Sequence, residues 1–334
     1  MRILIIRFSS FGDIILTTPV INELINKYPD AEIDYLVYKK FSDAITLNPK
    51  IKRYYYFDKK MNRNRKYISD MIEHLKMGNY DYVIDLHSKF LSQYIGKKTS
   101  KKCNAMYLKY SKRKWWKSVL VKMRIIRYKA DRSIVESYFT AVKKLGINYV
   151  DEEIDFYFSD ETEAQMVEKY NLKNRKYIVL APGASKVTKE WIYYEELANK
   201  ITTETDYDVV AIGGKEDYLK VKETQRIQNL AGKLNFKESG VMLKYAKFAV
   251  TNDSGPFHIA RAMKIKTIVI FGPTDPKMFT YNERTYLLTS GQDCSPCSLH
   301  GDKKCPKGHF KCMKELTHEK VYDTIIDKID KIDN

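Results

Sequence analysis

The 334-residue chain is long enough for two domains of ordinary size, and its 44% hydrophobic residues suffice for packed cores. No apolar run reaches the roughly 18 residues that a membrane-spanning helix needs, and the N-terminal stretch MRILIIRF is too short for a signal peptide. We therefore expect a cytoplasmic protein whose five cysteines are reduced thiols.

The net charge of +17 is unevenly distributed along the chain. Residues 97–130 hold 13 Lys and Arg and no Asp or Glu, with Trp115 and Trp116 among them. Basic residues interleaved with aromatic and apolar ones suit an anionic membrane surface, and the same composition suits RNA. Because the chain has no nucleic-acid-binding motif, the sequence favours the membrane surface and no nucleic-acid partner.

The first half alternates apolar runs with helical patterns. Helices are expected at 13–27, 42–47, 67–77 and 133–145, and strands at 2–6, 33–37, 54–57 and 82–86. This alternation predicts an α/β domain with a parallel sheet covered on both faces. Asp13 follows the loop at the end of the first strand, where it suits either a helix N-cap or a general base at the mouth of a crevice.

The second half repeats this architecture after a change to acidic composition, and we place the linker between the halves around 155–165. Strands are expected at 177–180, 209–212, 248–250 and 267–271, followed by a terminal helix at 317–330. The turn PGASK after the first of these strands suits a phosphate, although such turns are frequent. An acid after the next strand, in GGKED, suits a ribose or a helix start.

Residues 247–276 read as strand, turn, helix, strand and turn. Asp253 or Ser254 can cap the helix, Gly255 lets the backbone turn closely, and His258 lies on the first helical turn. One interpretation is a plain helix cap with a satisfied histidine. The turn GPTDP at the next strand end favours a second one, because two adjacent turns make a crevice in which a helix N-terminus binds an anion, most often a phosphate.

Four cysteines near the C-terminus have two, seven and six residues between them. This pattern is compatible with a zinc site of four thiolates, although its spacing is not that of a common zinc ribbon. Such a metal would be structural, and we expect none in catalysis. The four residues are Cys294, Cys297, Cys305 and Cys312.

NDSGPFHIARAM followed by IVIFGPTDP resembles the signature of glycosyltransferase family 9, the ADP-heptose heptosyltransferases of bacterial lipopolysaccharide synthesis. SSFGDIILTTPVINEL is similar to the first motif of that family, and PGASKVTKEW is similar to its donor-phosphate motif. The resemblance covers nearly the whole chain, at strand-end motifs in the expected order.

The resemblance implies a GT-B fold, in which two Rossmann-like domains face a central cleft. Residues 1–158 would bind the acceptor and residues 159–316 the nucleotide sugar, while the helix in 317–334 would pack back on the N-terminal domain. The implied reaction is inverting transfer of heptose from ADP-L-glycero-D-manno-heptose to the lipopolysaccharide inner core (Kdo-lipid A or heptose). It would need no cofactor and would take place at the inner face of the inner membrane.

The resemblance also implies roles for individual residues. Asp13 would be the catalytic base, and Lys189 would hold the donor diphosphate. Because Asp217 stands where the family usually has Glu, Glu216 is the alternative ribose ligand. Residues implied for an anionic glycolipid acceptor are Arg7, Ser10, Arg63, Arg65 and His87, and those implied for the donor are Ser185, Thr188, Asp217, Asp253, Ser254, Gly255, His258, Pro273 and Thr274.

Three alternatives remain open at the level of sequence. The first is a related glycosyltransferase with another sugar or glycan acceptor. The second is a nucleotide-sugar hydrolase or epimerase, which would turn over the donor without an acceptor. The third is a non-enzymatic basic protein that binds nucleic acid with a steep salt dependence.

Overall fold

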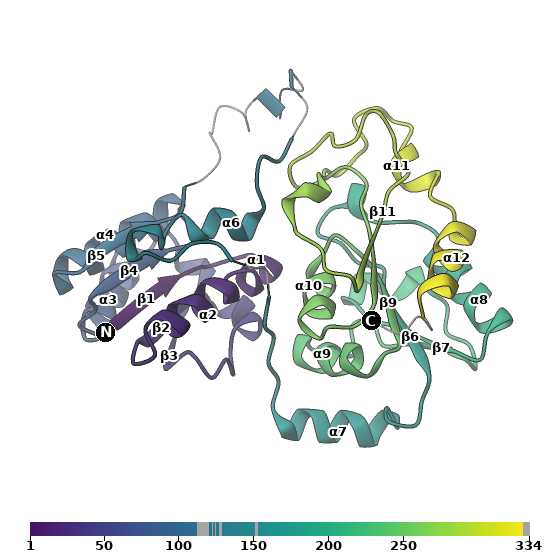
Figure 1. Cartoon of the computed structure of the whole chain (residues 1–334), viewed down its shortest axis with the longest axis horizontal. Helices are drawn as coiled ribbons and strands as arrows, with labels where there is room; N and C mark the ends of the chain where they lie inside the picture. Colours follow the sequence, from purple (N-terminus) through teal and green to yellow (C-terminus); the bar gives the residue numbers. More distant parts are fainter. Residues whose placement is uncertain (112–119, 122, 124, 127–128, 151–152, 330–334) are drawn as a thin grey trace. The chain divides into compact units, whose positions relative to one another are not determined.

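The computed structural model describes residues 1–111, 120–121, 123, 125–126, 129–150 and 153–329, and the chain divides into two compact units. The first holds Met1–Arg113 and Arg132–Tyr157, and the second holds Lys114–Asp131 and Phe158–Asn334 (Figure 1). The sequence analysis placed all of 1–158 in one domain, whereas this division gives 114–131 to the second unit. No helix in the described part of the chain is long and apolar enough to cross a bilayer.

The first unit is built on a five-stranded parallel sheet with the order β3-β2-β1-β4-β5. Its strands are β1 (Arg2–Ile6), β2 (Glu32–Tyr38), β3 (Arg53–Phe57), β4 (Tyr82–Asp85) and β5 (Met106–Lys109). The helices are α1 (Phe11–Ile15), α2 (Thr18–Lys27), α3 (Arg65–Lys76), α4 (Phe90–Cys103) and α6 (Ile134–Phe139), with 3-10 turns η1 (Lys39–Ala44), η2 (Lys59–Met61) and η3 (Lys143–Leu145).

The helix expected at 13–27 is broken into α1 and α2. Pro19 lies in the first turn of α2, where a missing N–H costs no hydrogen bond within α2. Without that N–H, α1 and α2 cannot be joined into one continuous helix. Thr17 lies in the break, and its hydroxyl donates to the Ile14 carbonyl at 2.7 Å. Neither α4 nor β5 is predicted from the sequence, because lysines and arginines dominate residues 97–130 and obscure their apolar periodicity.

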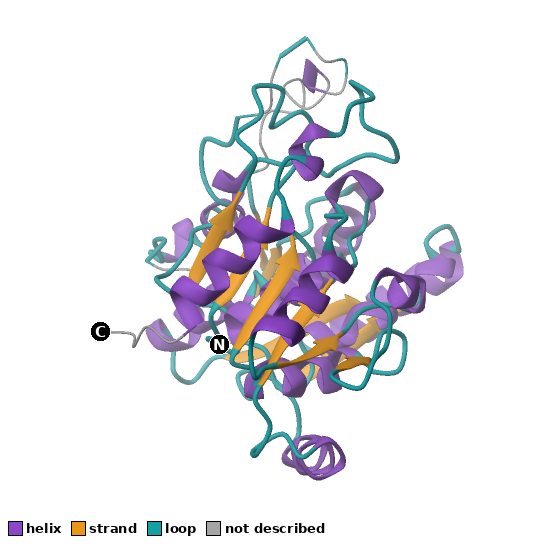
Figure 2. Cartoon of the chain, turned by 90° about the vertical axis from the view of Figure 1, so that its right-hand side faces the viewer, coloured by secondary structure: helices purple, strands orange, loops and turns teal. Residues whose placement is uncertain are grey.

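The second unit is built on a six-stranded parallel sheet with the order β11-β10-β9-β6-β7-β8, covered by helices (Figure 2). Its strands are β6 (Tyr177–Ala181), β7 (Asp208–Ala211), β8 (Ile227–Asn229), β9 (Phe248–Asn252), β10 (Thr267–Ile270) and β11 (Thr285–Leu288). The helices are α7 (Asp160–Tyr170), α8 (Tyr194–Glu204), α9 (Phe236–Tyr245), α10 (Gly255–Ala262), α11 (Lys311–Lys314) and α12 (His318–Ile329), with η4 (Val187–Lys189), η5 (Lys215–Lys220) and η6 (Pro276–Met278).

Helix α7 occupies part of the stretch that was expected to be a linker. Ser159 is its N-cap and accepts a hydrogen bond from the Thr162 amide at 3.1 Å. The acidic residues that suggested a change of domain lie in the first helical turn, where the helix dipole favours negative charge.

The terminal helix α12 packs on α8 within the second unit, and its expected packing on the N-terminal domain stays a prediction. Its apolar residues Val321, Ile325 and Ile329 belong to the core beneath α8 and the sheet. Trp191, in the same core, donates from its indole N–H to the Leu316 carbonyl at 2.7 Å. The helix therefore completes the hydrophobic core of the second unit.

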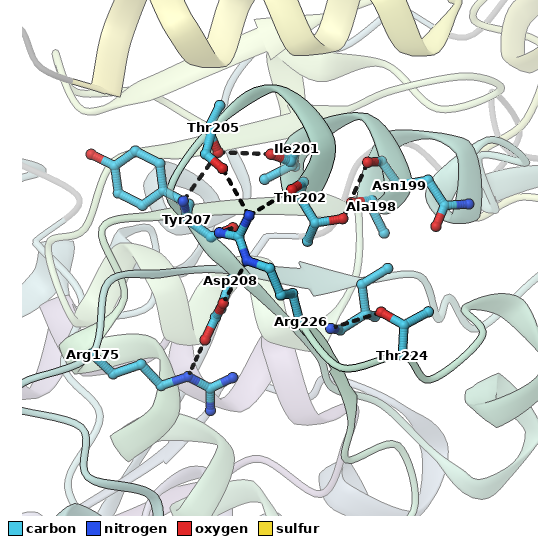
Figure 3. Close-up of polar contacts among 11 residues, drawn as sticks. Arg175, Ala198, Asn199, Ile201, Thr202, Thr205, Tyr207, Asp208, Thr224 and Arg226 are labelled. Carbon is cyan, nitrogen blue, oxygen red and sulfur yellow. Dashed lines mark hydrogen bonds and ion pairs between the residues drawn. The ribbon is translucent and has the colours of Figure 1, made fainter.

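Arg226 fastens the C-terminal end of α8 to the start of β7 (Figure 3). Its guanidinium donates to the carbonyls of Thr202 and Thr205 at 2.6 and 2.9 Å. Asp208 lies between Arg226 and Arg175, at 3.3 and 3.0 Å. A cation suits the negative end of a helix, and this cluster lies at the amino end of the strand. We assign it a structural role.

In each unit successive strands are added first on one side of the starting strand and then on its other side, so the strand order changes direction between two adjacent parallel strands. β1 and β4 are these strands in the first unit, and β6 and β9 in the second. In open α/β sheets the loops at the carboxyl ends of such strands bind ligands. The topology therefore points to the loops after β1 and β4 in one unit and after β6 and β9 in the other.

The packing of α12 yields a stability prediction. Ile325 is 0% exposed, so Ile325→Ala is expected to lower the free energy of unfolding of the second unit by about 2 to 5 kcal/mol. Ile326, its neighbour on the helix, is 43% exposed, and Ile326→Ala should change stability by no more than about 0.5 kcal/mol. Urea unfolding of both variants tests this, and equal effects would contradict the placement of α12.

Candidate active site

Asp13 lies on α1, after the loop that follows β1, with 31% of its side chain exposed. Its Oδ2 accepts hydrogen bonds from the Ser10 amide at 3.1 Å and the Ser10 hydroxyl at 2.6 Å. The Arg7 guanidinium lies 3.0 Å from the same oxygen, and the Tyr138 hydroxyl is 3.5 Å from Oδ1. Asp13 is thus part of a capping box, and its carboxylate is also held in a fixed orientation at the sheet edge.

Arg7 lies behind this carboxylate and is 6% exposed. Its Nη1 donates to the Leu86 carbonyl at 2.6 Å, and its guanidinium carbon lies 5.2 Å from the centre of the Tyr138 ring. Burial acts to lower the pKa of Arg7, but Tyr138 and Asp13 outweigh it and raise the pKa above its ordinary value. Arg7 therefore stays cationic and holds Asp13, while its contact with the acceptor stays a prediction.

The other residues predicted to bind the acceptor divide into accessible and buried ones. Ser10 is exposed, and so are Arg63 and Arg65 beside the N-terminus of α3. His87 is 4% exposed, and its ring packs edge-on against Phe8 with the centroids 5.4 Å apart. Its burial at the end of β4 favours a structural role.

The carboxylate of Asp253 joins three turns of the second unit. It lies after β9, and its Oδ2 is 2.8 Å from the ammonium of Lys189 in the turn after β6. Thr274, in the turn after β10, donates its hydroxyl to the same oxygen at 2.8 Å. Lys189 and Asp253 are both buried, so removing either one would leave the other as a buried charge without its partner, which is destabilising.

The N-terminus of α10 begins directly after Asp253. Ser254 is the N-cap, and its Oγ is buried without a hydrogen-bond partner among the described residues. A buried polar atom of this kind needs an explanation, for which a bound ion is one candidate, and a helix N-terminus suits an anion. His258 is buried on the next turn, and its ring packs against Phe279 with the centroids 5.1 Å apart.

Asp217 does not present an open carboxylate. It is buried, accepts a hydrogen bond from the Gly214 amide at 2.8 Å, and pairs with Lys220 at 2.7 Å. A Cβ added at Gly183 would lie 2.2 Å from its Oδ2, so Asp217 fills the space beneath the turn after β6. These contacts favour a structural role for Asp217, whose contact with a ribose stays a prediction, while Glu216 is exposed.

Two further residues predicted to bind the donor contact the loop that carries the cysteines. Thr188 is buried, and its hydroxyl exchanges hydrogen bonds with the backbone of Asp302. The carbonyl of Pro273 accepts from the amides of Cys297 and Ser298, each at 2.9 Å. Ser185 is exposed at the turn after β6, where it remains accessible.

The cysteines of this loop are free thiols. Cys294 Sγ lies 3.8 Å from Nε2 of His309. Burial, with a contribution from the nearby Cys297, Cys294 and Cys305, raises the pKa of Cys312 to about 12, so this thiol is protonated at neutral pH. Among the described residues no group of three or more His, Cys, Asp or Glu side chains is arranged to hold a metal ion.

Comparison with known proteins identifies the family to which this chain belongs. The model of glycosyltransferase family 9 (heptosyltransferase) matches residues 68–308, which is well over half of the chain. The chain belongs to glycosyltransferase family 9. It is therefore an enzyme that transfers a glycosyl group, and the alternative of a non-enzymatic nucleic-acid-binding protein is removed.

The sequence similarity between this family 9 member and its relatives extends over both units. It is 28% identical to lipopolysaccharide heptosyltransferase 3 of Escherichia coli strain K12 over 285 residues, which cover 79% of this chain and 80% of the relative. It is 25% identical to lipooligosaccharide heptosyltransferase 2 of Campylobacter jejuni over 339 residues, 97% of each chain.

A solved structure shows that the fold is shared as well. The E. coli heptosyltransferase WaaC with ADP-2-deoxy-2-fluoro heptose has a TM-score of 0.70 to this chain at 19% identity, covering 98% of this chain and 99% of the other. The two Rossmann-like units are those of the GT-B fold, as the resemblance in the sequence predicts.

Sequence reasoning missed several residues that the structure brings to these sites. Tyr138 reaches Asp13 from α6, and Asp302 reaches Thr188 across 114 positions of sequence. Tyr138 and Asp302 are ordinary residues in their local sequences, so spacing carried no signal for them.

The turn after β4 is held by Asp85, which is fully buried at the end of that strand. Its carboxylate accepts from the amides of His87 and Ser88 at 2.9 and 2.7 Å.

A structural role of Asp217 can be tested through stability. Asp217→Ala leaves the Gly214 amide and the Lys220 ammonium without this carboxylate, so the free energy of unfolding should fall by about 1 to 3 kcal/mol. Glu216→Ala, at the exposed neighbouring acid, should change it by no more than about 0.5 kcal/mol. Denaturant unfolding of the two variants measures both values, and an unchanged Asp217→Ala would refute the structural role.

Proposed function

We propose that this family 9 enzyme is an inverting heptosyltransferase that moves heptose from ADP-L-glycero-D-manno-heptose to a lipopolysaccharide inner-core acceptor, Kdo-lipid A or heptose. The relatives named as lipopolysaccharide and lipooligosaccharide heptosyltransferases support this substrate class. The observation that carries it is the contact of the Lys189 ammonium with Asp253 at the N-terminus of α10, where the buried Ser254 hydroxyl has no partner in the described part of the chain.

The second unit would hold the donor through its diphosphate. A lysine ammonium has three donors, so Lys189 can keep its contact with Asp253 and also donate to a phosphate oxygen. The Ser254 hydroxyl and the amides at the start of α10 add donors at the same edge. These groups stabilise the negative charge that develops on the departing ADP, and Glu216 would accept from the ribose hydroxyls.

The first unit would supply the base. Ser10 and Arg7 hold the Asp13 carboxylate in place, and we assign to this carboxylate the proton of the acceptor hydroxyl as that hydroxyl attacks the anomeric carbon. Ser10 and the exposed Arg63 and Arg65 would bind the anionic acceptor. No metal ion or cofactor enters the proposed step.

Asp13→Asn tests the proposed reaction because it keeps the shape of the side chain and removes its basicity. Purified wild type should transfer heptose from ADP-heptose to Kdo-lipid A, and the variant should lose at least about a hundredfold of this rate. Asp70→Asn, a change at an exposed position of α3, is the matched control and should keep the wild-type rate.

The outcomes separate the parts of the proposal. Transfer by Asp13→Asn at the wild-type rate would exclude Asp13 as the base. If the wild type binds ADP but transfers nothing, the sugar or the acceptor is wrong and a related glycosyltransferase becomes the better assignment. Consumption of the donor without any acceptor would favour hydrolysis or epimerisation.

We also propose that the enzyme binds an anionic membrane surface, where its glycolipid acceptor would lie, at the inner face of the inner membrane. Part of the basic segment 97–130, with Trp115 and Trp116, lies outside the described residues. The described part includes the end of α4, where Lys97, Lys98 and Lys101 are exposed. Phe90 and Tyr94 of the same helix are also exposed, a combination that suits a lipid headgroup region.

Vesicle sedimentation tests the membrane proposal. Each lysine near an anionic leaflet contributes about 1 kcal/mol, so changing Lys97, Lys98 and Lys101 together to Gln should weaken binding to phosphatidylglycerol vesicles by roughly a hundredfold. The matched control changes three exposed lysines of the second unit, Lys169, Lys173 and Lys222, and should bind like the wild type. Equal weakening by both triple variants would indicate only a general charge effect.

A further inference from the structure

The loop that connects β11 to α11 is paired with the turn that carries Lys189. The Thr188 amide and hydroxyl both donate to the Asp302 carbonyl, at 3.2 and 3.0 Å, and the Asp302 amide donates back to the Thr188 hydroxyl at 2.7 Å. Three hydrogen bonds therefore fix the backbone of the loop to the residue next to Lys189. The Thr188 hydroxyl, predicted to bind the donor, is occupied by this pairing.

Gly301, directly before Asp302, lies against the aliphatic stem of Lys189. A Cβ added at Gly301 would be 2.7 Å from Cγ and 3.0 Å from Cδ of Lys189, and 3.0 Å from Cβ of Lys186. The φ of Gly301 is +76°, a conformation that favours glycine. The backbone thus approaches the lysine more closely than any other residue type would allow.

Lys189 is consequently constrained at both ends of its side chain. Asp253 holds the ammonium, while the backbone at Gly301 closes one side of the stem. A lysine side chain is otherwise flexible, with many rotamers available to its charge. Restricting it before the ligand arrives keeps the ammonium directed at one place, which lowers the cost of ordering on binding.

We propose that Gly301–Asp302 is a positioning element for Lys189 in the donor site. The loop acts through Lys189 and does not itself contact the donor, and the inference rests on the proposed function of Lys189 as the residue that holds the donor diphosphate. Displacing the stem by the width of a methyl group would move the ammonium away from the phosphate. Misplacement by about 1 Å is enough to reduce a rate by roughly a hundredfold.

Gly301→Ala tests the proposal against two glycines of the same loop. Gly291 and Gly308 also have positive φ values, +69° and +75°, but a Cβ added at either would meet nothing within 4 Å. Gly291→Ala and Gly308→Ala therefore introduce the same backbone strain without touching Lys189. ADP affinity, measured by titration calorimetry, and kcat/KM for ADP-heptose should fall by about tenfold or more for Gly301→Ala only.

The Lys189→Ala background distinguishes positioning from a general disturbance of the loop. If Gly301 acts through Lys189, adding Gly301→Ala to Lys189→Ala should cause no further loss of ADP affinity, so the two changes are not additive. The proposal is wrong if Gly301→Ala binds ADP as Gly308→Ala does, or if it costs the same factor with and without Lys189. Failure of the wild type to bind ADP would instead overturn the proposed function, and this inference with it.

Should Gly301→Ala fail to fold, Thr188→Val provides the same test by a different change. It removes the hydroxyl that pairs with Asp302 and adds no bulk near Gly301. ADP affinity should again fall about tenfold, whereas Thr203→Val, at an exposed position of α8, should bind ADP like the wild type. Wild-type affinity in Thr188→Val would overturn the proposal.

Discussion

The buried carboxylate of Asp253 is the contact on which the candidate donor site depends. Lys189 and Thr274 both bind its Oδ2, and these three residues come from turns after three neighbouring strands. A buried charge without a partner is costly, so each turn is stable in this arrangement only while the others are in place. The ion pair of Lys189 and Asp253 thereby places an ammonium group beside the N-terminus of α10, where an anion is favoured.

The first unit uses the same principle at its own sheet edge. Asp85 binds the amides that follow β4, and Arg7 bridges from Asp13 to the Leu86 carbonyl next to that turn. In both units, then, charged groups at the point where the strand order reverses hold the loops in place. A loop held in this way can present a reactive side chain with little motion, which is what positioning for catalysis requires.

Family 9 membership was visible in the sequence because its motifs lie at strand ends, where local patterns are distinctive. Apolar runs predicted four strands in each sheet, namely all seven inner strands and the edge strand β3, since strands buried on both faces are almost continuously hydrophobic. The edge strands β5, β8 and β11 were missed because they are short and partly exposed. Charge likewise hid α4, whose lysines interrupt its apolar face.

The sequence by itself determined the two α/β units, the family, and the positions of Asp13, Lys189 and the turn at Asp253. Only the tertiary structure decided what each of these side chains contacts. Arg7, His87, Thr188 and Asp217 have the polar side chains that a ligand contact needs, yet the fold buries them against partners inside the protein. The physical reason is that a hydrogen bond depends on distance and burial, and these arise from segments as far apart as Thr188 and Asp302, which no local pattern connects.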